Sequence, residues 1–598
     1  MMGSVNHLPV ISTKDVSTKW PQPRNIDILL PDIISVLSIA PGTAGNTAIW
    51  QDLPADDDND DADRPRTRAI PGETGAPAGE VSSVRAADAV RSTTSGQLRL
   101  GPRGFAVASW LAPAVVIGGI TARRWWQEGG LPTGLDGGQW LALGRGFFGR
   151  GRSTAGAYPP LIPLIVDAAR MLVDPMTALR LIASGSLLAI LIAVYLIARD
   201  GLGPWFAVPV TAIIGLSSAL TEPAAFGGYP QQLAFACLLL AAWCLAHYLT
   251  EGRGRYLAGT ATTLSGAALT HLIYFPLALA TVGSVWMLWL TTRPRRTVIL
   301  RRSLYAAIAA IASVACFLPT LLAFWRAGYA PPLAASGLSL SGAFRYGTRE
   351  APWFWGTIVA GGLLSVAVTW PRRVTPVWLV AASLAVISLP LFLVTAEVRL
   401  LPPLLTGACL MAGFGLQRLE ARLRRLPWSV LPLIATIAAP VLLWPRADAA
   451  ATAYYRYYRV VDPSLLNAAQ AVRAHDPGGV VAVRHDRRGW PIGWWFEGLT
   501  ETRIAVGADD RWLGFPSERD AAHLAGQFFG ERLTGMALTD LARRTGVEML
   551  VFRKWEWIGW QRWLADPEPV VTIVYDDDQF MVLAIRRDQA SGPSHARE

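Results

Sequence analysis

The chain has 598 residues, of which 52% are apolar and only 16% are charged. Soluble domains carry about 25% charged residues, so the composition argues against a chain that is soluble throughout. The formal net charge is +10, but the basic residues cluster at the ends of apolar segments, where they set membrane topology. We therefore expect membrane lipids, and no nucleic acid, as partners.

The first segment, residues 1–103, is polar and rich in Ser, Pro and Gly, with an acidic run over 56–61. It contains too little apolar surface to offset the entropy that ordering would cost. We predict a disordered N-terminal tail in the cytoplasm.

Residues 104–445 hold apolar segments of about the length that crosses a hydrocarbon core. They predict a polytopic α-helical membrane domain of about eleven spans. The two segments on either side of residue 271 are the least clearly separated. The predicted spans are 104–122, 177–198, 204–220, 230–250, 256–271, 272–291, 303–325, 353–370, 376–395, 400–416 and 428–445.

The arginines between these spans are unevenly distributed. Five loops that we place in the cytoplasm hold 14 Arg in 37 residues, and the four opposite loops hold 10 in 94. Because cytoplasmic loops are enriched in basic residues, we predict a multi-pass plasma membrane protein with its C-terminal domain outside. The cytoplasmic loops are 199–203, 251–255, 292–302, 371–375 and 417–427.

The first external loop, 123–176, is unusually long, and loops of that size are often functional. Within it, Pro159–Val173 is apolar but carries Asp167 and Arg170. A span here would reverse the orientation of every later loop. We therefore predict a helix that lies at the membrane surface.

Residues 446–598 predict an extracytoplasmic soluble α/β domain, in which alternating apolar residues indicate strands and the longer periodic runs indicate helices. It contains no sequence motif for nucleotide binding or for a metalloprotease. The predicted strands are Val480–Val483, Glu548–Phe552, Val570–Tyr575 and Phe580–Ile585, and the predicted helices are Pro463–Ala474, Glu518–Phe529 and Ala537–Thr545.

Asp136-Gly137 follows the first span, and Tyr158-Pro159-Pro160 comes later in the same loop. This layout resembles the GT-C superfamily of membrane glycosyltransferases, which includes actinobacterial arabinofuranosyl- and mannosyltransferases. The resemblance implies a polyprenyl-phosphate sugar donor and a glycan, lipid or protein acceptor. It assigns Asp136 as the base that deprotonates the acceptor hydroxyl. The alternative for Asp136 is a solvated turn.

Two further residues on the predicted external side are candidates. The resemblance implies a second acidic residue near the donor, and Glu222 in the second external loop fits; alternatively, it only ends a helix. His271 ends a predicted span and is a candidate for contacting the donor phosphate, because ionisable residues at that depth usually face a cavity. A structural histidine is equally compatible with its position.

The donor phosphate requires a cation, and arginine is a permanently charged, planar partner for it. The resemblance implies an arginine in a late external loop, which favours Arg399. A local pair with Glu397 is the alternative role. Arg345 and Arg349, together with Arg326, are further candidates in loop 326–352.

Trp490, Trp494 and Trp495 are candidates for acceptor binding, as is Tyr158, because sugar rings stack on aromatic faces. Core packing is the alternative for each tryptophan. Some GT-C members need a divalent cation such as Mg²⁺ or Mn²⁺, and the sequence leaves this open because no three oxygen ligands converge.

Two other functions compete with a glycosyltransferase. A transporter or flippase of lipid-linked sugars is disfavoured, because the two halves of the chain show no repeat. A non-catalytic, glycan-binding scaffold of the cell envelope remains compatible with the tryptophans.

Overall fold

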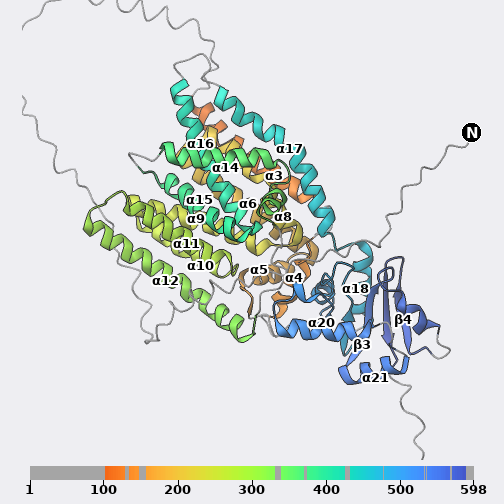
Figure 1. Ribbon diagram of the computed structural model, residues 1–598. Coiled ribbons are helices and arrows are strands. Elements are labelled where there is room, and N and C mark those ends of the chain that lie inside the picture. Colours follow the sequence, from red (N-terminus) through yellow and green to blue (C-terminus); the bar gives the residue numbers. More distant parts are fainter. Residues whose placement is uncertain are drawn as a thin grey trace, which may run out of the picture. The chain divides into compact units, whose positions relative to one another are not determined.

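A computed structural model describes residues 102–127, 134–146, 157–329, 339–369, 374–423, 431–475, 477–530, 533, 535–565 and 569–586. The predicted tail 1–103 lies almost entirely outside the described residues. The described residues contain a large helical part, followed by a smaller part with a five-stranded sheet (Figure 1).

Each predicted span coincides with one helix, except 204–220, which falls on two. These helices are α3 (Pro102–Gln127), α6 (Pro175–Leu202), α7 (Pro204–Gly215), α8 (Ser218–Phe226), α9 (Tyr229–Glu251), α10 (Gly254–Ala268), α11 (Tyr274–Leu290), α12 (Arg296–Arg326), α14 (Pro352–Thr369), α15 (Pro376–Thr395), α16 (Leu401–Leu423) and α17 (Leu431–Tyr458).

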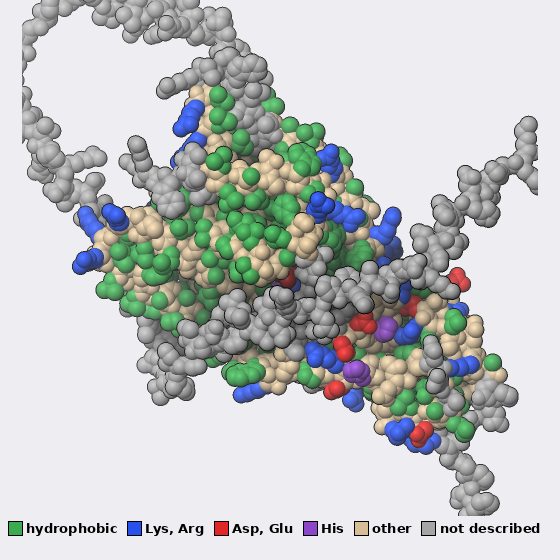
Figure 2. All heavy atoms as spheres, viewed as in Figure 1, with side chains coloured by type: hydrophobic (Ala, Val, Ile, Leu, Met, Phe, Trp, Pro, Cys, Tyr) green, Lys and Arg blue, Asp and Glu red, His purple; other side chains and the backbone are tan. Residues whose placement is uncertain are grey.

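Among the described residues, five helical segments are long and apolar enough to cross a membrane, and a sixth arises if α7 and α8 form one bent span. This confirms a polytopic helical protein, and the number of eleven spans stays a prediction. Helix α17 continues past the predicted domain boundary at residue 445. Figure 2 shows apolar side chains over most of the helical part's visible face.

Local signals in the sequence explain where several helices begin and end. Asp174 accepts hydrogen bonds from the backbone N–H groups of Met176 and Thr177, both at 3.0 Å, and so caps α6. A proline follows this cap, which suits the first turn of a helix. Gly203 ends the same helix with a φ of 77°, a conformation that glycine adopts without strain.

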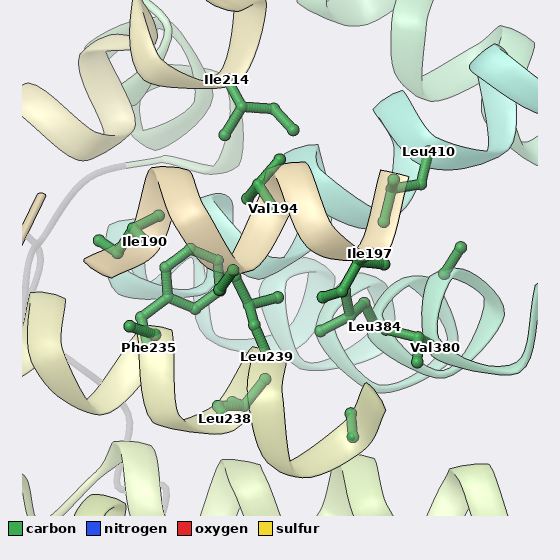
Figure 3. Close-up of a cluster of buried hydrophobic side chains, with 14 of the residues drawn as sticks. Ile190, Val194, Ile197, Ile214, Phe235, Leu238, Leu239, Val380, Leu384 and Leu410 are labelled. Carbon is green, nitrogen blue, oxygen red and sulfur yellow. The ribbon is translucent and has the colours of Figure 1, made fainter. Parts of the chain in front are cut away.

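The core of the helical part is a continuous apolar cluster (Figure 3). Its centre is α6, which packs against α7, α9, α15 and α16. Full burial of side chains of this size stabilises a protein by about 1.5–3 kcal/mol each. The residues labelled in Figure 3 are Ile190, Val194, Ile197, Ile214, Phe235, Leu238, Leu239, Val380, Leu384 and Leu410.

The predicted span 204–220 needs a correction, because it is two helices rather than one. Helix α7 ends at Gly215 and α8 begins at Ser218, with an angle of 46° between them. The apolar pattern continues across the break, so hydropathy alone does not show the bend. The predicted site residue Glu222 lies in α8, after the bend.

The described residues of loop 123–176, the predicted first external loop, contain two short helices, α4 (Gly137–Gly146) and α5 (Leu161–Arg170). Helix α5 falls inside the segment predicted to lie at the membrane surface. Its 10 residues extend about 15 Å, half of a hydrocarbon core. Leu164 and Ile165 on this helix are exposed. Its length therefore agrees with a helix that does not span.

The C-terminal part is a mixed sheet with the strand order β2-β1-β3-β5-β4. The pairs β1–β2 and β1–β3 are parallel, whereas β3–β5 and the β4–β5 hairpin are antiparallel. The predicted strands are confirmed, and β2 was not predicted. The strands are β1 (Val480–Val483), β2 (Arg503–Val506), β3 (Val547–Arg553), β4 (Val571–Asp576) and β5 (Phe580–Ile585).

Five helices accompany this sheet. Those over 463–475, 516–528 and 535–545 agree with the prediction to within two residues at each end, and α19 and α22 were not predicted. The helices are α18 (Pro463–His475), α19 (Gly493–Thr500), α20 (Pro516–Phe528), α21 (Gly535–Thr545) and α22 (Gln561–Leu564).

Helices α4 and α5 share a hydrophobic core with the C-terminal sheet. Leu141 of α4 and Ile162 of α5 belong to the same buried cluster as Val483, Trp495 and Phe496. In addition, Arg145 of α4 donates hydrogen bonds to two backbone carbonyls at the end of α19, at 3.1 and 2.6 Å. The first external loop is thus attached to the C-terminal part.

Candidate active site

Asp136 lies directly before α4, where the first external loop meets the end of α8. Its backbone N–H donates a hydrogen bond of 2.9 Å to the carbonyl of Phe226. Trp140 donates from its indole to the carbonyl of Gly227 at 2.7 Å. Gly227 has a φ of 99°, and a Cβ there would lie 3.1 Å from the Asp136 nitrogen. The glycine therefore permits the close approach that holds Asp136 beside α8.

Glu222 projects from α8 and is buried, with 8% of its surface exposed. One carboxylate oxygen accepts hydrogen bonds from the hydroxyl groups of Tyr458, at 2.8 Å, and Tyr346, at 3.2 Å. The two hydroxyl oxygens lie 2.8 Å from each other. Glu222 is therefore not a solvated residue at a helix end.

The surroundings of Asp136 favour a proton-transfer role. Burial raises the pKa of its carboxyl, the charge of Arg399 lowers it and the charge of Glu222 raises it, with a net pKa of about 7. The two carboxyl groups and the arginine come from three separate segments of the chain. The structure therefore brings three of the predicted site residues within electrostatic range of one another.

Arg399 lies in the short helix η2 (Val398–Leu400). Its Nε is 3.7 Å from a carboxylate oxygen of Glu397, and 44% of its side chain is exposed. An exposed pair of this kind contributes about 0–1 kcal/mol, which leaves the guanidinium available to an anion. The hydroxyl of Tyr274 donates a hydrogen bond to the Arg399 carbonyl at 2.7 Å, which holds this segment in place.

His271 lies between α10 and α11. Its Nδ1 accepts hydrogen bonds from the backbone N–H groups of Ile273, at 3.2 Å, and Tyr274, at 3.3 Å. His271 therefore has the structural role that its position in the sequence also allowed, because it fixes the start of α11. Nε2 is therefore the ring nitrogen that remains for another partner. Arg399 is close enough for its charge to act on the imidazole.

The remaining predicted polar residues lie in different surroundings. Arg345 in α13 (Leu340–Gly347) and Arg349 just after it are exposed, as is Arg326 at the end of α12. Tyr158 accepts a hydrogen bond from Gln139 at 2.9 Å and donates one to Glu518 of α20 at 3.2 Å. Tyr158 thus links the loop to the C-terminal part.

The three tryptophans require a correction. Trp490, Trp494 and Trp495 are exposed by 1%, 5% and 0%, so they do not form an open surface for a sugar. Trp495 donates a hydrogen bond to the Gly134 carbonyl at 3.2 Å. Trp490 stacks on Tyr458 at 5.8 Å between ring centroids. Their role in this structure is core packing that supports the site.

Tyr346 and Tyr458 are the site residues that the sequence reasoning missed. Tyrosines are common near membrane surfaces, so neither residue stands out alone. The segment after the last predicted span is unusually rich in tyrosine, with the run Tyr454-Tyr455-Arg456-Tyr457-Tyr458. This run was the sequence signal that could have identified Tyr458.

The described residues contain no group of three or more His, Cys, Asp or Glu side chains that could hold a metal ion. Glu222 already accepts two phenolic hydrogen bonds. The described residues thus assemble no such ligand set for Mg²⁺ or Mn²⁺, and the divalent cation, which the sequence left open, stays untested.

No family model and no curated protein matches this chain. Solved structures do resemble it. The apo oligosaccharyltransferase of Archaeoglobus fulgidus aligns with a TM-score of 0.53 and 12% identity, over 75% of this chain and 69% of that one. The arabinofuranosyltransferase AftD from Mycobacteria aligns with a TM-score of 0.50 and 17% identity over 80% of this chain. This chain spans only 40% of AftD. The chain has the fold of the GT-C membrane glycosyltransferases.

Proposed function

We propose that this protein is a membrane glycosyltransferase that moves a sugar from a polyprenyl-phosphate donor to an acceptor on the outer face of the plasma membrane. The observation that carries the proposal is the convergence of Asp136, Glu222 and Arg399. They come from three segments, yet their charges act on one another within a GT-C fold. Both similar structures bear the names of sugar transferases.

Asp136 acts as the general base. Its carboxylate takes the proton of the acceptor hydroxyl while the acceptor oxygen forms a bond to the anomeric carbon. The bond from that carbon to the donor phosphate oxygen breaks, and polyprenyl phosphate leaves with the electron pair. A pKa of about 7 suits this role, because a base works best when its pKa is near the operating pH. We expect inversion at the anomeric carbon.

Arg399 binds the donor phosphate and stabilises the charge that grows on it during bond cleavage. Its exposed, weakly paired guanidinium is suited to a charge-assisted hydrogen bond. His271, with Nε2 available, is a second contact for the donor. Glu222 assists Asp136 by orienting the acceptor, and the acceptor is a cell-envelope glycan, lipid or protein.

A transporter or a glycan-binding scaffold fits less well. A transporter is expected to place its charged site near the bilayer midplane, whereas Arg399 lies in a connection between α15 and α16. A scaffold needs an exposed glycan surface, and the candidate tryptophans are buried.

The test is a transfer assay with the full-length protein in nanodiscs, a panel of radiolabelled polyprenyl-phosphate sugars and bacterial envelope fractions as acceptors. We expect labelled product with at least one donor. Arg399→Gln should raise the KM for that donor about tenfold or more, as expected from losing a charge-assisted hydrogen bond.

Arg473→Gln is the matched control, because Arg473 is an exposed arginine of α18 in the C-terminal part. Its donor KM should equal that of the wild type. Binding of envelope glycan without transfer from any donor would instead support the scaffold.

A further inference from the structure

A second positively charged region lies beside the candidate active site and has no part in the mechanism above. It is a pocket of about 560 Å³ between the C-terminal end of α13 with the residues that follow it, the C-terminal end of α17 and the loop after β1. Three arginines and three tyrosines make up most of its lining: Arg349, Arg456, Arg488, Tyr346, Tyr454 and Tyr457. We call it the triple-arginine pocket.

The charges of this pocket are not neutralised by its walls, because no acidic residue is among its lining residues. The guanidinium of Arg349 lies over the ring of Tyr454, 5.8 Å from the centroid. Among the described residues, none forms an ion pair with Arg349 or Arg456. Two cations that face a cavity without a carboxylate partner form a receptor for an anion.

Arg488, the third arginine of the lining, is held in place by two contacts. It donates a hydrogen bond of 2.5 Å to the carbonyl of Tyr457. Its guanidinium also lies 4.4 Å from the ring centroid of Trp490. A guanidinium held by such contacts loses little entropy when a ligand binds, so the pocket is preorganised.

The pocket lies next to Glu222, one of the two proposed catalytic carboxyl groups. Tyr346 lines it, and the hydroxyl of the same residue donates to Glu222 at 3.2 Å. Arg399 acts on the carboxylates from the connection between α15 and α16 instead. Glu222 therefore lies near two separate cationic groups, Arg399 and the triple-arginine pocket, which fits two anionic groups from two substrates.

The pocket is also displaced along α17 from a pair of residues typical of a membrane interface. The guanidinium of Arg123 lies 5.2 Å from the ring centroid of Trp444, and tryptophans concentrate at the level of lipid headgroups. Arg456 follows about three helical turns further along α17. Tyr458, which donates to Glu222, lies two residues beyond Arg456 on the same helix. The pocket therefore lies at the level of the candidate active site, where the glycan of an acceptor must reach, rather than at the level of Trp444.

We propose that the triple-arginine pocket binds a phosphate group carried by the water-exposed glycan of the acceptor. The two cations without an ion-pair partner, Arg349 and Arg456, match the charge of a phosphate monoester, about −1.5 to −2 at neutral pH. The assignment of the phosphate to an acceptor rests on the proposed glycosyltransferase function. The binding of an anion in this pocket does not depend on that function.

The test is a binding measurement on the full-length protein in phosphatidylcholine nanodiscs. Mannose 6-phosphate is the probe, mannose is the neutral comparison, and polyprenyl phosphate in the nanodisc is the lipid arm. We expect mannose 6-phosphate to bind and mannose not to bind. Arg349→Gln and Arg456→Gln should each weaken binding of the sugar phosphate about tenfold or more, with polyprenyl phosphate binding unchanged.

Arg459→Gln is the matched control, because Arg459 is an exposed neighbour on the same segment that does not line the pocket. It should bind the probe as the wild type does. Equal binding of mannose, or unchanged affinity in both pocket variants, would overturn the proposal. A loss of polyprenyl phosphate affinity in these variants would overturn it too, because the pocket would then belong to the donor.

Asp136→Asn separates this inference from the proposed function. The variant should bind mannose 6-phosphate normally while it loses transfer. If the wild type binds the probe through Arg349 but transfers no sugar from any donor, the anion site stands and the glycosyltransferase proposal fails.

Discussion

Asp136 is held where burial and the charges of two neighbours act on it together. Burial and Glu222 favour the protonated acid, and Arg399 favours the carboxylate. The result, a pKa of about 7, places the two forms in balance near neutral pH. Proton transfer by this group should therefore respond strongly to pH and to the loss of either neighbour.

The first prediction concerns this pH dependence. Only the carboxylate can accept a proton, so kcat/KM should fall about tenfold per pH unit below the pKa of about 7 and level off above it. Because Arg399 lowers the pKa, Arg399→Gln should move the midpoint to higher pH. Measurements of kcat/KM between about pH 5 and 9 check this, because this ratio reports the pKa of the free enzyme. A flat profile over that range would contradict the role of Asp136.

The second prediction concerns Tyr458, which donates the shorter of the two hydrogen bonds to Glu222. Tyr458→Phe removes this bond and keeps the ring that stacks on Trp490. A hydrogen bond to a charged group contributes about 1.5–3 kcal/mol, so we expect kcat to fall about tenfold or more with little change in donor KM.

Tyr305→Phe is the control, because Tyr305 lies in α12 and packs against the core of the helical part. It should leave kcat unchanged. If Tyr458→Phe lowers the thermal midpoint but not kcat, Tyr458 only supports the fold and does not position Glu222.

Among the structural elements, the contact between α4 and α19 decides how the first external loop meets the C-terminal part. A Cβ on Gly138 would lie 2.5 Å from the backbone nitrogen of Trp495. A Cβ on Gly498 of α19 would lie 2.6 Å from the Gly138 carbonyl. The two helices therefore cross at glycines, which lets their backbones touch.

The third prediction follows from this crossing. Gly138→Ala places a methyl group against backbone that has no room to move, and overpacking of this kind costs about 1–3 kcal/mol. Gly185→Ala on α6 is the control, since a Cβ there meets nothing within 4 Å. Thermal unfolding of the purified protein should show a lower midpoint for Gly138→Ala only. Equal midpoints would show that the contact is looser than the structure indicates.

The sequence predicted elements well where a local pattern determines them. The strand Val480–Val483 has the same bounds in the structure, because a short run of β-branched residues flanked by glycine indicates a buried strand. Helix α19 was missed because Gly493–Thr500 is dominated by aromatic residues and carries no helix-start signal. Its tryptophans suggested an exposed surface for sugar binding, whereas the fold buries them.

At the scale of the whole molecule, the sequence predicted helix positions and the approximate location of the site. Asp136, Glu222 and Arg399 were predicted from the resemblance and from their place in external loops. Their tyrosine partners were not, since Tyr346 and Tyr458 are 112 residues apart and meet only in the folded chain. Long-range contacts of this kind leave no local pattern.

The fourth prediction concerns membrane topology. Asp578, in the β4–β5 turn, and Arg253, before α10, are both exposed, and the distribution of arginines places them on opposite sides of the membrane. In a Cys316→Ala background, a cysteine at 578 should react with a membrane-impermeant maleimide in intact cells. A cysteine at 253 should react only after permeabilisation. The reverse pattern would invert the topology and move the site to the cytoplasmic face.

The most direct test of the central claim is the transfer rate of Asp136→Asn. The amide keeps the size of the side chain but cannot accept the proton, and general-base catalysis contributes about 10²–10⁴-fold. We predict a loss of this size in kcat, with donor binding and thermal stability close to those of the wild type. A folded Asp136→Asn protein that transfers sugar at the wild-type rate would contradict the account.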